Sequence, residues 1–186
     1  MHKYLPNVFI FLDQHNKLLF ENNNINIGII YRNYESKNRE TELLKIANAC
    51  KKKRYQLYVS NDLKLAIRFK ADGIYIPSFN KTKSYLNLEN RNLKVIGSAH
   101  NQIQIQNKIK QKCTAIFLAP LFPVKKKNDY LNIHKFNFLT RSRKINMIAL
   151  GGINEKNISK LKLLNVKGFG AISLFKKKPA YKGRFF

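Results

Sequence analysis

Acidic residues are scarce in this chain. Only 10 Asp and Glu stand against 36 Lys and Arg in 186 residues, which gives a formal net charge of +26. Such an imbalance is typical of proteins with polyanionic partners. The basic residues are spread along the whole sequence, however. The chain is also rich in Asn and Ile, as in the segment 101–112 (NQIQIQNKIKQK), and A/T-rich codons favour the same three residue types. No aromatic-basic RNA motif or helix-turn-helix pattern is present, so we favour a compositional origin over nucleic-acid binding. A positive surface still attracts phosphorylated small molecules.

Long apolar runs are also missing. No run approaches the roughly 20 residues that cross a bilayer, so we expect no membrane-spanning helix. The apolar stretch near the N-terminus ends at Asp13 without a small-residue cleavage site, which favours a first strand over a signal peptide. Cys50 and Cys113 are the two cysteines, and they lack metal-type spacing. This usage predicts a reduced, cytoplasmic protein.

Several catalytic signatures are absent as well. The sequence contains no P-loop, no GxGxxG fingerprint and no Ser-His-Asp arrangement. His2, His15 and His134 lie in unrelated contexts and form no metal-binding pattern. No linker or second domain is apparent, so residues 1–186 are interpreted as one domain with a sizeable core.

What the chain does have is alternation. Eight short runs rich in β-branched and aromatic residues read as strands: 8–13, 26–32, 56–61, 73–77, 94–99, 115–120, 146–150 and 168–175. Segments of helical character lie between them, most clearly 40–53, 61–70 and 154–164. The strands are continuously apolar, as expected when helices cover both faces of a parallel sheet.

Eight such units predict an α/β fold: a compact (β/α)8 TIM barrel, with an open doubly wound sheet as the alternative. The chain is short for a barrel. Its first helical segment, 16–24, is meagre, and the tail 176–186 hardly holds a final helix. We therefore expect a partner subunit, in a homodimer, to cover exposed barrel surface.

In a barrel of this kind the active site gathers at the carboxyl ends of the strands, with phosphate near the last two. Gly151 and Gly152 follow the seventh run, where their backbone could approach an anion; a tight turn is the alternative. Ser173 lies near the end of the eighth run. This position favours phosphate binding.

Polar residues end three other runs. Asn61 ends the third run and Asp62 follows it. The two could hold a hydrated Mg²⁺, although a helix cap is the simpler interpretation and both are compatible. Arg32 ends the second run and suits phosphate, or is an ordinary surface arginine. Ser98 lies near the end of the fifth run and His100 directly follows it, and both could contact a substrate. With no acidic partner apparent, His100 fits a loop or cap residue better than a general base.

Taken in order, these pieces resemble the thiamine phosphate synthase family, including its thiazole tautomerase branch, over roughly residues 26–175. The matching segments are YRNYE, YVSNDLKLAIRFKADGIYIP, IGSAHN, APLFPVKKK, ALGGIN and GAISLF. The family joins hydroxymethylpyrimidine diphosphate to thiazole phosphate with the help of Mg²⁺, and releases diphosphate.

The resemblance implies a role for each matching residue. Arg32, Asn61 and Lys127 would hold the diphosphate, and Asp62 would bind Mg²⁺. Ser98 would touch the pyrimidine or the diphosphate. The thiazole phosphate would be held mainly through backbone N–H groups of Gly152, Ile172 and Ser173.

The chain departs from the family at several positions. Ile30 and Tyr34 replace a glutamine and a lysine around Arg32. After the fourth run, Pro77 and Ser78 replace a glycine-glutamine pair, and Asn80 stands in place of the second magnesium-binding aspartate, as a weaker ligand.

The sixth-strand loop departs as well. Val124 and Lys126 replace two threonines, and 119–127 lacks the histidine of the tautomerase branch, which counts against that activity. Lys125 and Lys126 either compensate for lost charge or reflect composition. The alternative function is a non-synthase paralogue that binds a phosphorylated ligand in a regulatory or salvage role.

Overall fold

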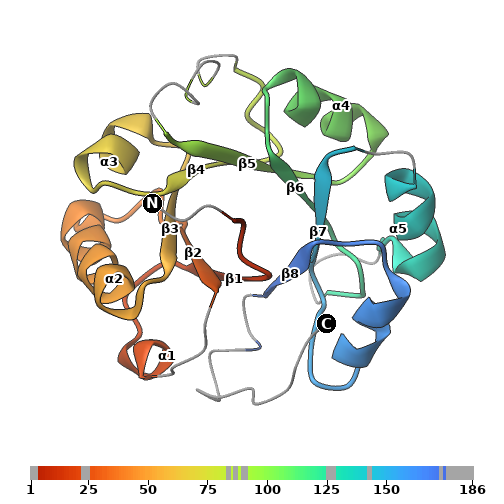
Figure 1. The fold of residues 1–186 in the computed structure, drawn as a ribbon, viewed down its shortest axis with the longest axis horizontal. Helices are drawn as coiled ribbons and strands as arrows, with labels where there is room; N and C mark the ends of the chain where they lie inside the picture. Colours follow the sequence, from red (N-terminus) through yellow and green to blue (C-terminus); the bar gives the residue numbers. More distant parts are fainter. Residues whose placement is uncertain are drawn as a thin grey trace.

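Eight parallel strands close into a barrel in chain order, from β1 to β8 (Figure 1). The computed structural model describes residues 4–21, 26–82, 85, 88, 92–124, 129–141, 144–171 and 174. The strands are β1 Val8–Leu12, β2 Ile27–Tyr31, β3 Gln56–Ser60, β4 Gly73–Ile76, β5 Lys94–Ala99, β6 Ala115–Leu118, β7 Asn146–Leu150 and β8 Gly168–Ala171. The pairing of Val8 with Phe169 closes the barrel. The predicted barrel is confirmed, and the open sheet is excluded.

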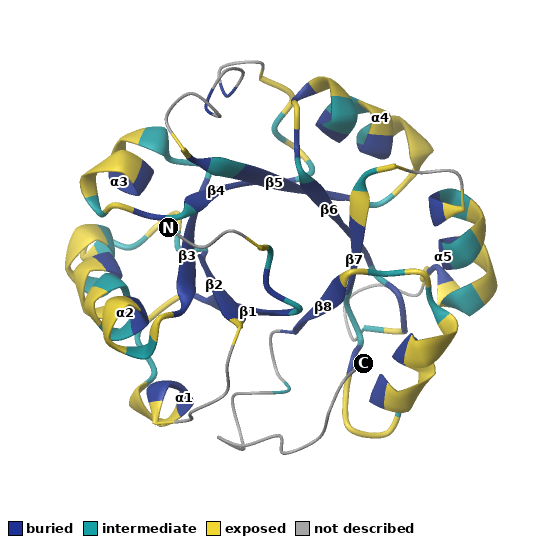
Figure 2. Cartoon of the chain, in the orientation of Figure 1, coloured by how far each residue is buried: buried dark blue, intermediate teal, exposed yellow. Residues whose placement is uncertain are grey.

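Helices surround the barrel on the outside (Figure 2). They are α1 Lys17–Phe20, α2 Arg39–Lys53, α3 Leu63–Arg68, α4 Gln102–Lys110, α5 Asn132–Thr140 and the 3₁₀ helix η2 Ile158–Leu163. The first helix has 4 residues, as short as expected. The tail 176–186 lies outside the described residues. No helix of the described part is both long and apolar enough to cross a bilayer.

The barrel interior is filled by aromatic rings. The phenyl ring of Phe117 contacts that of Phe9 edge-on, with centroids 5.0 Å apart, and that of Phe11 at 5.6 Å. Tyr75 packs against both Phe11 and Phe117. Edge-to-face contacts of this kind add to the free energy gained by burying the rings. The interior of the barrel is therefore filled by packed side chains.

A second core lies between the strands and the helices. From α2, the side chains of Leu43, Ile46 and Cys50 are buried; helical spacing predicts Leu44 on the same face, but it is 49% exposed. Both Cys50 and Cys113 are free thiols and buried.

Two helices escaped prediction, and a third begins later than expected. The segment QIQIQ in α4 alternates apolar and polar residues, a strand-like pattern. It is helical because Asn101 caps it, with Oδ1 accepting from the Gln104 amide at 3.0 Å. The Phe-rich α5 was also missed. The predicted helix 154–164 is reduced to η2, since the side chains of Asn154 and Asn157 bind backbone groups of the preceding turn.

Candidate functional site

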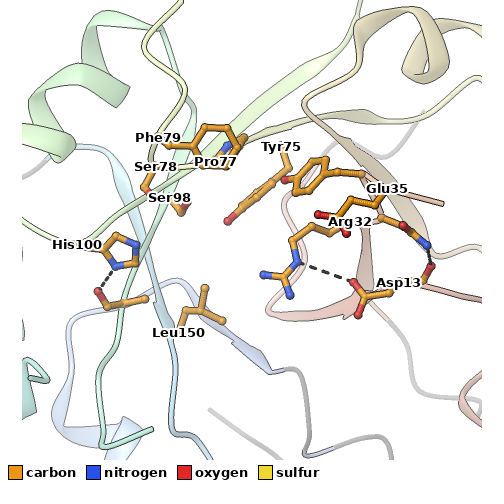
Figure 3. A pocket seen from close by; sticks show the side chains of 13 residues that line it. Asp13, Arg32, Glu35, Tyr75, Pro77, Ser78, Phe79, Ser98, His100 and Leu150 are labelled. Carbon is orange, nitrogen blue, oxygen red and sulfur yellow. Dashed lines mark hydrogen bonds and ion pairs between the residues drawn. The ribbon is translucent and has the colours of Figure 1, made fainter. Parts of the chain in front are cut away.

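A cavity of about 510 Å³ opens at the carboxyl ends of the strands (Figure 3). Its size is typical of small-molecule sites. The lining residues come from the ends of β1, β2, β4, β5, β6 and β7 and the segments that follow: Asp13, Arg32, Asn33, Tyr34, Glu35, Tyr75, Pro77, Ser78, Phe79, Ser98, His100, Ala119 and Leu150. Two predicted site residues, Arg32 and Ser98, thus lie in one cavity.

Arg32 is held on one side of the cavity. Its Nε lies 3.9 Å from Oδ1 of Asp13 (Figure 3). Its guanidinium carbon lies 5.4 Å from the ring centroid of Phe11. The ring and the carboxylate both attract the guanidinium and favour this position, in which its other donors are available to a ligand.

Tyr75 and Ser98 form the floor. Both are nearly fully buried, and both line the cavity. Burial raises the pKa of Tyr75 to about 12, although a hydrogen bond with Ser98 opposes the rise. The phenol therefore stays protonated at neutral pH.

His100 lies across the cavity from Arg32 (Figure 3). Its Nδ1 lies 2.7 Å from the carbonyl oxygen of Ala119. Because a carbonyl only accepts, Nδ1 carries the proton in the neutral ring and Nε2 keeps its lone pair. His100 is not the cap of α4, which is Asn101; it lines the cavity, where the neutral ring offers Nε2 as a hydrogen-bond acceptor.

Asn61, Asp62 and Asn80 lie beside the cavity and do not line it. Asp62 caps α3: its Oδ1 accepts from the Leu65 amide at 2.9 Å. Its Oδ2 accepts from Nη1 of Arg39, also at 2.9 Å. The cap interpretation of Asp62 is confirmed.

The described residues here do not fit a magnesium ion. Both carboxylate oxygens of Asp62 already accept from protein donors. Asn80 turns its Oδ1 to the Thr82 amide at 2.8 Å and its amide NH₂ to Asn61. No group of three or more His, Cys, Asp or Glu suited to a metal occurs among the described residues. A hard cation wants oxygen ligands that are free to coordinate.

Gly151 and Gly152 make a tight turn against the segment after β6. Both have positive φ, 92° and 72°. A Cβ at Gly152 would meet the Phe122 carbonyl oxygen at 2.5 Å, and the Gly151 carbonyl accepts from the Phe122 amide. The pair is therefore required for close packing of two loops. The helix expected directly after it begins only at Ile158.

Three predicted residues lie outside the described part of the chain: Lys127, Ile172 and Ser173. Lys125 and Lys126 do so as well. Their relation to the cavity stays a prediction.

Sequence reasoning missed an aromatic edge of the cavity. Tyr34 and Phe79 meet at the mouth with ring centroids 6.4 Å apart, and the Tyr34 hydroxyl bonds to that of Ser60. Tyr75 could have been found by the strand-end rule, because it lies two residues before Pro77 at the carboxyl end of β4. Asp13, which ends the first run, had the same signal.

Comparison with known proteins places these features in context. The model of the family described as thiamine monophosphate synthase matches residues 23–175. A thiamine-phosphate synthase of Prochlorococcus marinus subsp. pastoris is 33% identical over 135 residues, covering 71% of this chain and 38% of that protein. One from Mannheimia succiniciproducens is 27% identical over 136 residues, covering 70% of this chain and 62% of that protein. The match thus spans less than two thirds of either relative.

A solved structure supports the fold. Thiamine phosphate pyrophosphorylase from Pyrococcus furiosus superposes with a TM-score of 0.74 at 16% identity, covering 92% of this chain and 89% of that one. At this identity the likeness concerns the barrel alone.

Proposed function

Because the chain belongs to the thiamine monophosphate synthase family, we propose that it joins hydroxymethylpyrimidine diphosphate to thiazole phosphate, giving thiamine phosphate and diphosphate. The observation that carries the proposal is the strand-end cavity that Arg32 and Ser98 both line.

In this reaction the bond between the pyrimidine methylene carbon and the diphosphate oxygen breaks, and its electron pair leaves with diphosphate. The lone pair of the thiazole nitrogen then forms the new carbon–nitrogen bond. Arg32 is the cavity's cation among the described residues and would stabilise the charge that develops on the leaving group. Ser98 on the floor and Nε2 of His100, across the cavity from Arg32, would hold polar groups of the pyrimidine.

The family resemblance also implies Mg²⁺, at Asp62 and Asn80. Because the oxygens of these two residues are engaged by protein donors, we assign no step to the metal. The reaction should be assayed both with Mg²⁺ and with a chelator.

The test is a product assay. Purified protein is incubated with both substrates, and thiamine phosphate is measured for the unmodified chain, for Arg32→Met and for Arg141→Met. Arg141 is an exposed arginine outside the cavity and serves as the matched control. We expect product from the unmodified chain and from Arg141→Met, and a loss of about 100-fold or more in kcat/KM for Arg32→Met. No product from the unmodified chain would overturn the synthase proposal.

A second candidate is a barrel that binds a phosphorylated ligand without the coupling step. The charge of the described lining counts against the coupling step: Asp13 and Glu35 outnumber Arg32 and oppose the negative charge that develops on a departing diphosphate. Saturable binding of thiazole phosphate without product formation would support this candidate over the first.

The proposed setting is a cytoplasmic homodimer. Sedimentation at micromolar concentration measures the oligomeric state. A monomer at that concentration would overturn the homodimer proposal.

A further inference from the structure

Lys108 is a buried lysine on α4, outside the cavity. Its side chain is 1% exposed, and burial lowers its pKa to about 8. No carboxylate of the described residues forms an ion pair with it. The titratable group beside it is the buried thiol of Cys113. An ammonium in such a place is costly unless all of its protons are bonded.

All three protons have acceptors. Nζ donates to the carbonyl oxygens of Pro77 and Asn80 and to Oε1 of Gln111, each at 2.8 Å. Two of the three acceptors belong to one loop, residues 77–82, which follows β4 and is called the β4 loop below. The lysine thus ties α4 to that loop.

Gln111 completes the connection. Its side chain is 2% exposed, and its Nε2 donates to the carbonyl oxygens of Asn80 at 3.1 Å and Thr82 at 2.7 Å. Gly97 on β5 makes room for the lysine, because a Cβ there would lie 2.8 Å from Cδ of Lys108. The arrangement is therefore built from the β4 loop, strand β5 and the C-terminal end of α4.

The β4 loop carries part of the cavity wall. Ser78 and Phe79 line the cavity (Figure 3). The ring of Phe79 meets that of Tyr34. Asn80, whose carbonyl Lys108 holds, donates its side-chain amide to Oδ1 of Asn61 at the end of β3. Lys108 and Gln111 hold the backbone carbonyls of this loop, and the same loop carries the side chains of Ser78 and Phe79 that line the cavity. Holding the loop backbone therefore holds this part of the cavity wall.

We propose that Lys108, with Gln111, is a positioning residue that holds the β4 loop against the barrel, so that Ser78 and Phe79 form the wall of the ligand cavity. This proposal concerns the same cavity as the proposed function. Of the two tests below, only the kinetic one depends on the synthase activity.

The first test needs no activity. Lys108→Met keeps an unbranched apolar side chain and removes the three donors; Lys110→Met, an exposed lysine on the same helix, is the control. Each hydrogen bond lost from the charged ammonium costs about 1.5–3 kcal/mol, and every 1.4 kcal/mol is about tenfold in an opening equilibrium. We expect amide exchange at residues 78–82 to rise about tenfold or more in Lys108→Met alone, with β1 and β6 unchanged. Unchanged exchange at 78–82, or an equal rise throughout the barrel, overturns the proposal.

The second test separates positioning from a general structural role. For Lys108→Met we expect KM for the pyrimidine diphosphate to rise about tenfold while kcat changes less than about threefold, since the wall binds substrate and the reacting groups are untouched. A fall in kcat at constant KM contradicts the proposal. If the unmodified chain forms no product, the exchange result still decides the role of Lys108, and the two failures are distinguishable.

Should Lys108→Met fail to fold, Gln111→Leu tests the same connection without removing a charge. It deletes the two hydrogen bonds to the β4 loop and also the acceptor of one Lys108 proton. We expect a smaller rise, about threefold to tenfold, confined to residues 78–82. No local rise in this variant overturns the proposal.

Discussion

Arg39 at the start of α2 donates through Nη1 to Oδ2 of Asp62 at the start of α3, over 2.9 Å. The same guanidinium donates through Nη2 to the Ser60 carbonyl at 3.0 Å. Its Nε is buried and has no partner among the described residues. The pair joins two helix starts at the rim of the barrel, so Asp62 has a structural role whatever else it does.

Asp62→Ala and Asp62→Asn separate that role from charge. Asparagine keeps the cap on the Leu65 amide and loses the ion pair, whereas alanine loses both. We expect the free energy of unfolding to fall by about 2 kcal/mol in Asp62→Ala and by about half as much in Asp62→Asn, as measured by urea denaturation. Equal losses in the two variants would show that the cap contributes nothing.

Asp13→Asn should strengthen anion binding. Asp13 partly neutralises Arg32 at 3.9 Å, and both side chains are more than a third exposed, at 53% and 35%. The effect is therefore modest: we expect inorganic diphosphate to bind about twofold to fivefold more tightly, less so at high salt. Glu40→Gln removes the same charge beside Arg68, away from the cavity, and is the calorimetric control. An equal gain in both variants would make overall charge the cause.

Phe117→Ala should be severely destabilising. The ring is fully buried and contacts Phe9, Phe11 and Tyr75 inside the barrel. Its removal leaves a cavity in a closed barrel that cannot collapse, so we expect the free energy of unfolding to fall by about 3–5 kcal/mol. Phe138→Ala, at a ring that is 79% exposed on α5, should change it by less than about 0.5 kcal/mol. Comparable denaturation midpoints for the two variants would contradict the packing described for the interior.

The stabilising effect of Cys50 should decrease at alkaline pH. Burial raises the pKa of Cys50, so the folded state keeps a proton that the unfolded chain loses above about pH 8.5. The folded state then binds more protons, and the free energy of unfolding falls as pH rises. Lys108, whose pKa is lowered, acts in the opposite direction between pH 8 and 10. Comparison with Cys50→Ala isolates the thiol, because Lys108 is common to both proteins.

The measurement is reversible urea unfolding under reducing conditions at pH 7.5 and pH 10. We expect the stability advantage of the unmodified chain over Cys50→Ala to shrink by about 1–2 kcal/mol between these values. A constant advantage would mean that the thiol is accessible to solvent in the folded state.

Much of the fold was predictable, because each strand is a short run buried on both faces. The predicted helix 40–53 differs from α2 by one residue at its start. The prediction of secondary structure failed where the apolar spacing does not match the structure that the rest of the molecule imposes. The segment QIQIQ alternates like a strand, yet it is helical because Asn101 caps it and Ile105 is buried.

The candidate site, too, was predictable only in part. Arg32 and Ser98 were found because strand ends meet at one rim of a barrel. The bond between Asn80 and Asn61, the binding of His100 to Ala119 and the burial of Lys108 were not, since each depends on contacts between residues far apart in the sequence. The chain contains 36 Lys and Arg, and nothing in the sequence distinguishes the buried Lys108 from the other basic residues.

Tyr75 belongs to two parts of the molecule at once. Its ring packs in the aromatic interior against Phe11 and Phe117, and it also forms the floor of the cavity. A substitution there that reshapes the binding floor also loosens the barrel. Substitutions that change ligand preference, in evolution or in the laboratory, should therefore cost less stability in the loops at Tyr34, Ser78 and Phe79 than at Tyr75 in the floor.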